Sequence, residues 1–518
     1  MSALVSLPPL NAKMVDHMAL AQKAMAYFDS SPDPFHAVQT SIDLLKKGGR
    51  FQELDDNVSY ASQIKPGGKY YFTRNKSTLV AFAVGSAYEP GKGGFKIIGG
   101  HTDSPNLKVK PRSKRGGSGC LQLGVETYGG GLWHTWFDRD LGISGRVLIR
   151  NGDNKIEQRL VKLDRAILRV SNLAIHLTDD RNSFTVNKED HLSPILAMEA
   201  QKALNMPGSD VVAEEDNDGD KKKANATKKD GWSEYQEPLL LQLIADDLEL
   251  PIESIVDFEL NLFDVQKAAL GGARSEFIHS GRLDNLASCF LAVQALLEHD
   301  VQDDKDVSLV ALFDHEEVGS GSAVGAGSPI MADAVERITD ALSSGAGNPD
   351  LYQSTIKKSF CLSVDQAHAV HPNYAAKHEK NHQPRMNDGM VIKRNSNQRY
   401  ATNGMTGFLI REIARRSGLP PIQEFIVRND CACGSTIGPI ISAATGIRAI
   451  DMGCPQLSMH SIRETMGVCD CKLALCSCVL SPRCHALTYA FDSTVTNGLA
   501  LFKAYFKNFR EVDDDVQQ

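Results

Sequence analysis

Five clusters of acidic and imidazole side chains are spread along this chain of 518 residues, and their residue types are those that bind divalent metals. They are His101 with Asp103, Asp284, Glu316 with Glu317, Asp365, and His460. Two histidines with several carboxylates suit zinc, cobalt or manganese, with one carboxylate shared between two ions. The set therefore predicts a site at which two metal ions activate water for hydrolysis.

Most of these residues follow an apolar, β-branched run that predicts a buried strand. Four such strand exits carry candidate ligands: 95–100 before His101, 307–313 before Glu316, 361–364 before Asp365, and 447–453 before His460. Ligands of an open α/β sheet bind at the carboxyl ends of its strands. We therefore expect these side chains to meet at one edge of a sheet.

Each cluster also has an ordinary structural explanation. Asp284 precedes an apolar-periodic stretch from Leu286 to Leu297 that predicts a helix, so its side chain could be the N-cap. A single histidine such as His101 could be a hydrogen-bonded structural residue. Glu316 and Glu317 could form a solvated turn. Adjacent carboxylates point in different directions, however, so one could hold a metal while the other handles protons.

Five segments of the chain resemble the motifs of the M18 metalloaminopeptidases, and within that family those of the aspartyl aminopeptidase group. The segments are 99–105, 280–285, 314–320, 363–374 and 456–464. They stand in the family's order, and the resemblance spans nearly the whole chain. It implies an enzyme that removes acidic residues, Asp and Glu, from the amino termini of peptides.

The resemblance also implies a role for each clustered residue. One ion would be bound by His101 and Asp365 and the other by Glu317 and His460, with Asp284 bridging them. Glu316 would be the general base that takes a proton from water and passes it to the departing amine. Asp103 would orient the imidazole of His101 and raise its basicity. Zinc is the expected metal at both positions, with manganese or cobalt also accepted.

Selection of an acidic substrate residue requires a cation outside the ligand set. The resemblance assigns this role to Lys393 and a second substrate contact to His368. It implies that His176 reaches into the pocket of a neighbouring subunit. The structural alternatives are a solvated strand lysine at position 393 and a half-buried histidine at position 176.

Composition is that of an ordinary globular enzyme, with 42% hydrophobic and 23% charged residues. The net charge of −8 argues against a nucleic-acid-binding protein. No apolar stretch reaches the length of about 18 residues that a membrane span requires. Because residues 1–9 lack a basic region and a sustained apolar core, we expect no secretion signal and a cytoplasmic location.

The order of predicted elements indicates an α/β protein interrupted by a β-rich insertion, and the resemblance implies an α/β/α catalytic domain with a mixed central sheet. We expect residues 1–105 to form the first part of this domain and 258–518 the second part. Residues 106–257 form the inserted domain, which carries a charged segment at 208–229 that predicts a disordered loop. The resemblance implies that this domain makes dimers, which gather into a dodecamer. Trp133 and Trp136 could anchor such an interface or fill a core.

The chain has eleven cysteines, and five of them crowd into residues 469–484. Their C-x-C spacing differs from that of zinc knuckles. We expect the stretch 469–492 to be a surface insertion that departs from the family pattern, with a metal site or a gene-model artefact as alternatives. An odd total in a chain without a secretion signal favours reduced thiols.

Two other functions remain compatible with the sequence. One is an aminopeptidase of the same family that prefers neutral residues, which Lys393 argues against. The other is a catalytically idle assembly or cargo protein with the same fold. An intact set of five ligands with Glu316 beside them argues against that second alternative.

Overall fold

The computed structural model describes residues 12–199, 231–343, 348–468 and 497–517. The chain forms two compact units, one from Met1–Ser104 with Lys267–Gln518 and one from Pro105–Gln266. The loop expected at 208–229 and the insertion expected at 469–492 lie outside the described residues.

The first unit is built on a mixed sheet. Its strands, in spatial order, are β1 (Gln52–Glu53), β2 (Lys69–Arg74), β3 (Thr78–Val84), β13 (Val307–Phe313), β4 (Phe95–His101), β14 (Phe360–Val364), β18 (Arg448–Gly453), β16 (Val391–Arg394) and β17 (Gln423–Ile426). Neighbours from β13 to β18 are parallel, whereas β3 and β16 are antiparallel to them. Strands β13, β4 and β14 are buried along their whole length. Their continuous apolar sequence reflects a sheet covered on both faces.

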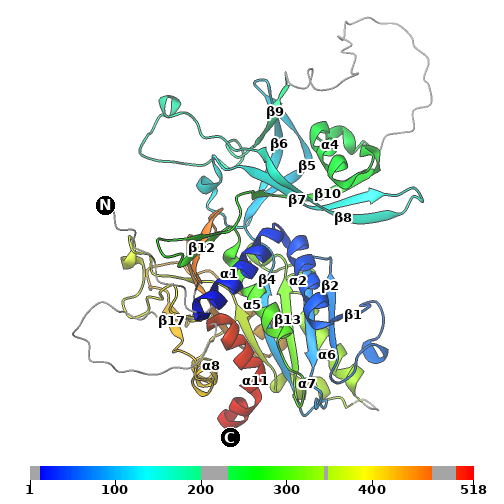
Figure 1. The fold of residues 1–518 in the computed structure, drawn as a ribbon, viewed down its shortest axis with the longest axis vertical. Coiled ribbons are helices and arrows are strands. Elements are labelled where there is room, and N and C mark those ends of the chain that lie inside the picture. The colour runs from blue at the N-terminus through cyan, green and yellow to red at the C-terminus, as the bar shows by residue number, and fades with distance from the viewer. Residues whose placement is uncertain (1–11, 200–230, 344–347, 469–496, 518) are drawn as a thin grey trace, which may run out of the picture. The chain divides into compact units, whose positions relative to one another are not determined.

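Helices cover both faces of this sheet (Figure 1). One face packs against α1 (Ala12–Ser30), α2 (Pro34–Gly49), α5 (Leu283–Leu297), α8 (Gly404–Arg416) and α11 (Asn497–Gln517). The other face packs against α6 (Ile330–Leu342), α7 (Leu351–Lys357), α9 (Ile437–Thr445) and the short helix η1 (Tyr60–Ser62). The α/β/α architecture with a mixed central sheet is therefore confirmed.

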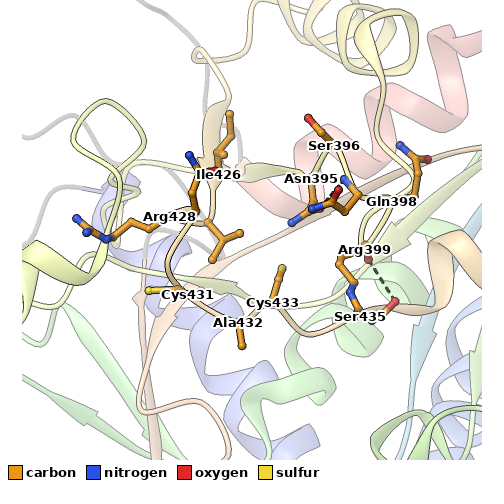
Figure 2. A pocket seen from close by; sticks show the side chains of 13 residues that line it. Asn395, Ser396, Gln398, Arg399, Ile426, Arg428, Cys431, Ala432, Cys433 and Ser435 are labelled. Atoms are coloured by element: carbon orange, nitrogen blue, oxygen red, sulfur yellow. Dashed lines mark hydrogen bonds between the residues drawn. The ribbon is translucent and has the colours of Figure 1, made fainter.

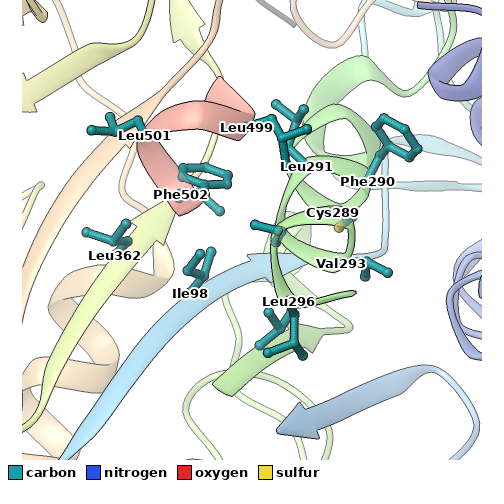
Figure 3. Close-up of a cluster of buried hydrophobic side chains, with 14 of the residues drawn as sticks. Ile98, Cys289, Phe290, Leu291, Val293, Leu296, Leu362, Leu499, Leu501 and Phe502 are labelled. Atoms are coloured by element: carbon teal, nitrogen blue, oxygen red, sulfur yellow. The ribbon is translucent and has the colours of Figure 1, made fainter. Parts of the chain in front are cut away.

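Helix α5 lies at the centre of the larger core. Figure 3 shows Ile98 of β4 and Phe502 of α11 on one side of this helix and Phe290 on the other, with Leu291 and Leu296 in the same cluster. These five side chains are at most 2% exposed. Because tightly packed interiors leave little room for displacement, this contact fixes the start of α5, where Asp284 lies, against the sheet.

A smaller five-stranded sheet in the same unit carries further residues of interest. Its strands, in spatial order, are β11 (Ala269–Gly271), β12 (Phe277–Ser280), β20 (Glu464–Gly467), β19 (Pro455–Leu457) and β15 (Ala367–His368). Short helices η6 (Glu316–Val318) and η7 (Ala375–Lys377) complete the unit. This sheet places Glu464 and His368 on strands that the sequence did not predict.

The second unit contains one antiparallel sheet with strands in the order β8 (Ile156–Leu168), β7 (Leu141–Arg150), β10 (Ile255–Asp264), β5 (Asn106–Gly117), β6 (Cys120–Tyr128) and β9 (Ile195–Met198). It also holds α4 (Pro238–Leu248) and the short helices η2 (Trp133–Trp136), η3 (Ile175–Leu177), η4 (Ser233–Tyr235) and η5 (Ile252–Ser254). The boundary expected at residue 257 falls inside β10, which pairs with β7 and keeps the chain in this unit to Gln266. Trp133 and Trp136 are 6% and 3% exposed, which favours the core interpretation over an interface.

The helix predicted over Leu286–Leu297 agrees with α5, which begins three residues earlier, at Leu283, and ends at Leu297. Within the described part of the chain, no helix combines the length and the apolar character that crossing a membrane requires.

Candidate metal centre

Three of the predicted strand exits are neighbours in the central sheet. His101 is the last residue of β4, Glu316 and Glu317 follow β13 on η6, and Asp365 follows β14. Because β13, β4 and β14 are adjacent and parallel, their carboxyl ends meet at one edge. Asp284 from the start of α5 and His460 from the turn after β19 reach the same place.

The two histidines lie on opposite sides of Asp284. His101 Nε2 is 3.4 Å from Asp284 Oδ1 and 3.6 Å from Asp365 Oδ1. His460 Nε2 is 3.6 Å from Asp284 Oδ2 and 3.4 Å from Glu317 Oε2. Each oxygen of Asp284 thus faces a different histidine and a different second carboxylate. This is the arrangement that a carboxylate shared between two ions requires.

Asp284 is not the N-cap of α5. The N-cap position is taken by Arg282, whose φ is 61°, and Asp284 has non-helical angles of φ −81° and ψ 104° inside the first turn. His315, before Glu316, and His460 also have positive φ angles of 62° and 66°. Non-glycine residues in this region of φ cost free energy and concentrate at functional sites.

Asp103 contacts His101 in a different way from the one expected. His101 Nδ1 donates to the backbone carbonyl oxygen of Asp103 at 3.0 Å, while the nearer carboxylate oxygen is 3.5 Å away. The Asp103 carboxylate instead accepts hydrogen bonds from the backbone N–H groups of Glu316 and Glu317, at 3.1 Å and 3.0 Å. Nδ1 therefore carries a proton even in the neutral ring, so Nε2 is the atom that can bind a metal once it has lost its own proton.

Glu464 is a site residue for which the sequence pattern predicted no role. Its side chain is buried, Oε2 accepts from the Asp284 N–H at 3.0 Å, and Oε1 accepts from the His460 N–H at 2.8 Å. One carboxylate thereby fixes the backbones of two candidate ligands. The only sequence signal was its place in the segment 456–464, where an acidic residue ends a polar turn.

Crowding of buried carboxylates shifts the ionisation of the whole cluster. Burial, reinforced by Asp365, raises the pKa of Glu316 to about 7 although His101 opposes the shift. Burial and the Asp284 charge raise the pKa of Glu317 well above its usual value. Burial lowers the pKa of His460, but Asp284 and Glu317 outweigh it and bring the pKa to about 10. The carboxylates around His101 likewise outweigh its burial and raise its pKa.

The residues present fit divalent ions. Asp284, Glu317 and His460 offer ligand atoms that all lie within 4.8 Å of one another, and so do His101, Asp284 and Asp365. Asp284 Oδ1 and Glu317 Oε1 are buried and accept no hydrogen bond from the part of the protein that is described. Burying a carboxylate oxygen without a hydrogen-bond donor costs folding free energy unless a cation neutralises its charge. Imidazole nitrogens with carboxylates are ligands that zinc accepts.

A cavity of about 500 Å³, the catalytic pocket, opens beside these ligands. Lys393 on β16 lines it but is only 2% exposed, so the solvated-lysine alternative is wrong. Its Nζ donates to Asp365 Oδ2 and to the Gln366 carbonyl oxygen, each at 3.1 Å. His368 on β15 and Tyr400 line the same cavity, and the Tyr400 ring lies 5.1 Å from Lys393 Nζ. Tyr400 was not among the residues expected at the site.

His176 lies on η3 in the second unit, where its side chain is exposed. It is therefore neither a strand residue nor half-buried. It makes no contribution to the ligand cluster of its own chain.

Metal binding should release protons. At neutral pH the raised pKa values leave His101 and His460 protonated in the metal-free protein, and each must lose a proton to bind an ion. The upward shift of the Glu317 pKa acts in the same direction. We predict that zinc added to metal-free protein in weak buffer acidifies the solution. The apparent affinity should rise with pH by about tenfold per unit for each proton released. Titration calorimetry in buffers of different ionisation enthalpy measures this number, and binding independent of pH would contradict the prediction.

Replacing Glu464 with glutamine should weaken metal binding without touching a ligand. An amide has one acceptor oxygen, so its NH₂ group must face either the Asp284 N–H or the His460 N–H, and one ligand segment loses its hydrogen bond. We expect Glu464→Gln to lower zinc affinity about 10- to 100-fold. The matched control is Glu412→Gln on the surface of α8. Equal affinities in the two variants, by calorimetry, would show that Glu464 does not position the ligands.

Comparison with known proteins agrees with this geometry. Residues 27–477 match the family model described as aminopeptidase I zinc metalloprotease (M18). The aspartyl aminopeptidase of Aspergillus oryzae is 48% identical over 466 residues, which cover 86% of this chain and 92% of that protein. A probable aspartyl aminopeptidase of Ricinus communis is 46% identical over 95% of both chains.

Solved structures extend the comparison to three dimensions. A chain in the cryo-EM structure of the Ape4 and Nbr1 complex has a TM-score of 0.84 at 39% identity, covering 98% of this chain and 89% of that one. The S. cerevisiae mApe1 dodecamer has a TM-score of 0.78 at 29% identity, covering 96% and 99%. The family model spans every residue of the metal centre, and each of these relatives covers most of this chain. The chain therefore belongs to the M18 family of zinc metalloproteases, the aminopeptidase I family.

Proposed function

We propose that this enzyme removes amino-terminal Asp and Glu residues from peptides, with two zinc ions in the metal centre. The observation that carries the proposal is the position of Asp284, whose two oxygens face His101 with Asp365 on one side and His460 with Glu317 on the other. His101 and Asp365 would hold one ion, Glu317 and His460 the other, and Asp284 would bridge them. The same ligands would also accept manganese or cobalt.

Bound ions would make water more acidic and stabilise negative charge on the peptide oxygen. Glu316 is the carboxylate left over when the five ligands are assigned, and it lines the catalytic pocket. Its Oε2 lies 3.9 Å from His101 Nε2, beside the ligands but without a hydrogen-bond contact to His101. Glu316 would take a proton from the attacking water and deliver it to the departing amine. Asp103 would keep Glu316 in place through its backbone N–H.

Lys393 would select the acidic side chain of the substrate. An ammonium group has three N–H donors, and Asp365 and Gln366 occupy two of them. The third can meet a substrate carboxylate in the catalytic pocket, and His368 lines the same wall. The names of the relatives support this preference, because several are aspartyl aminopeptidases.

We extend the proposal to assembly and location. A dodecamer has been solved for the mApe1 relative, which supports a homo-oligomer for this chain, built from dimers that the second unit makes. His176 would reach a neighbouring subunit's pocket, and its neighbours Leu173, Ile175 and Leu177 are 60–69% exposed, as an interface requires. A cytoplasmic location is supported by free thiols at all six described cysteines.

Hydrolysis of Asp-, Glu- and Leu-arylamides tests the activity. The zinc-loaded enzyme should release product from the Asp and Glu substrates, and a chelator should abolish the release. Glu316→Gln should lower kcat by at least about 10²-fold, because the proton acceptor is lost, while zinc binding persists. Turnover retained in this variant would mean that another group is the base. No chelator-sensitive release from any substrate would sink the enzyme assignment and favour an idle assembly protein.

Lys393→Ala should change selectivity more than activity. Loss of a charge-assisted hydrogen bond costs about 1.5–3 kcal/mol, so kcat/KM for Asp- over Leu-arylamide should fall by one to two orders of magnitude. Because Lys393 also contacts Asp365, Lys393→Arg is the matched variant that keeps the charge. Faster cleavage of Leu than of Asp by the unmodified enzyme would contradict the acidic preference.

A further inference from the structure

A second cavity, which we call the arginine pocket, lies beside the catalytic pocket. It has a volume of about 630 Å³ and is lined by residues 395–399, 426–429, 431–433 and Ser435. Figure 2 shows that its walls come from the segments that follow strands β16 and β17. These strands are parallel neighbours, so the two segments leave the sheet on the same side.

The two pockets share a wall. Ser435 lines both of them, and its hydroxyl donates to the carbonyl oxygen of Arg399 at 3.3 Å (Figure 2). Arg399 lines the arginine pocket, whereas the next residue, Tyr400, is buried and lines the catalytic pocket. The N–H of Ala401 donates to the buried Asp451 carboxylate at 2.6 Å, which anchors this loop. The wall between the pockets is thus held by hydrogen bonds between side chains and the main chain.

The two pockets differ in the charged side chains that line them. Four carboxylates and Lys393 line the catalytic pocket, whereas the lining of the arginine pocket includes Arg399 and Arg428 and no Asp or Glu. Arg428 is paired with Asp430 through two hydrogen bonds of 2.8 Å and 2.7 Å. Arg399 is exposed and forms no ion pair with any residue in the described ranges. The side-chain amides of Asn395 and Gln398 add further donors to the same lining.

We propose that the arginine pocket binds a carboxylate of the peptide chain beyond the residue that is removed. This inference rests on the proposed function, which places the first residue in the catalytic pocket and requires the rest of the peptide to leave it. The arginine pocket shares the wall at Ser435 and offers the Arg399 guanidinium, which has no carboxylate partner among the described residues. A guanidinium binds carboxylates in a forked geometry. The carboxylate belongs to an acidic side chain at the second or third position or to the carboxyl terminus of a short peptide.

Three peptides distinguish these sources: Asp-Glu-Ala-amide, Asp-Ala-Ala-amide and Asp-Ala-Ala with a free carboxyl terminus. With the full-length zinc-loaded enzyme, we expect kcat/KM to be about tenfold higher for a peptide whose second carboxylate reaches Arg399 than for the neutral amide. A higher kcat/KM for Asp-Glu-Ala-amide means that the bound carboxylate is a side chain. A higher kcat/KM for Asp-Ala-Ala with a free carboxyl terminus means that it is the carboxyl terminus. Arg399→Ala should abolish this increase in kcat/KM over the neutral amide, and Arg399→Lys should retain part of the increase. Arg415→Ala, on the exposed face of α8, is the control that should keep it.

Equal kcat/KM for the three peptides, or a preference that survives in Arg399→Ala, overturns the proposal. A smaller assembly of Arg399→Ala with equal losses on all peptides, measured by light scattering, also overturns it and identifies the pocket as an interface between copies of this chain. If the unmodified enzyme cleaves neither the peptides nor Asp-arylamide, the proposed function itself has failed. Cleavage of Asp-arylamide without any preference among the peptides agrees with that function and rejects only the proposed role of the arginine pocket.

Discussion

Burial of several carboxylates at one edge of the central sheet is the constraint on which the rest of this structure depends. Asp284, Glu316, Glu317 and Asp365 lie close to His101, His460 and Lys393, and like charges at such short range cannot all ionise without compensation. In the metal-free protein this excess of negative charge is reduced by protonation, as the raised pKa values of Glu316 and Glu317 indicate. Divalent cations would neutralise the same excess of negative charge and would be bound by the same side chains. Metal binding would therefore stabilise the buried carboxylates and also supply the ions that catalysis needs.

Two further carboxylates hold the backbone of the segments that carry the candidate ligands. Asp103 accepts backbone N–H groups from the turn that carries Glu316 and Glu317, and Glu464 accepts the N–H groups of Asp284 and His460. Ligand segments with unusual backbone angles are thereby held without help from regular secondary structure. Because outer contacts of this kind orient ligands, they matter nearly as much as the ligands themselves.

Cationic side chains outside the candidate ligand set lie in two separate pockets. Lys393 lines the catalytic pocket and contacts Asp365, so it brings a cationic group into that pocket. Arg399 and Arg428 line a separate cavity behind the Ser435 wall. An enzyme with a net charge of −8 repels acidic peptides at long range, so local cations must supply the attraction.

The sequence by itself determined which residues are candidate metal ligands and which strands end at His101 and before Glu316 and Asp365, because a buried parallel strand is a largely apolar run and its exit is where polar residues first return. It also determined the α/β/α architecture, although β10 extended the inserted unit past the expected boundary. Only the tertiary structure decided that Glu464 supports Asp284, which is 180 residues away, and that Asp103 contacts His101 through its carbonyl oxygen. Burial of Lys393 and the wall between the two pockets were likewise decided there. Hydrogen bonds and cavities between distant segments leave no periodic pattern in a sequence, since each depends on how separate elements pack.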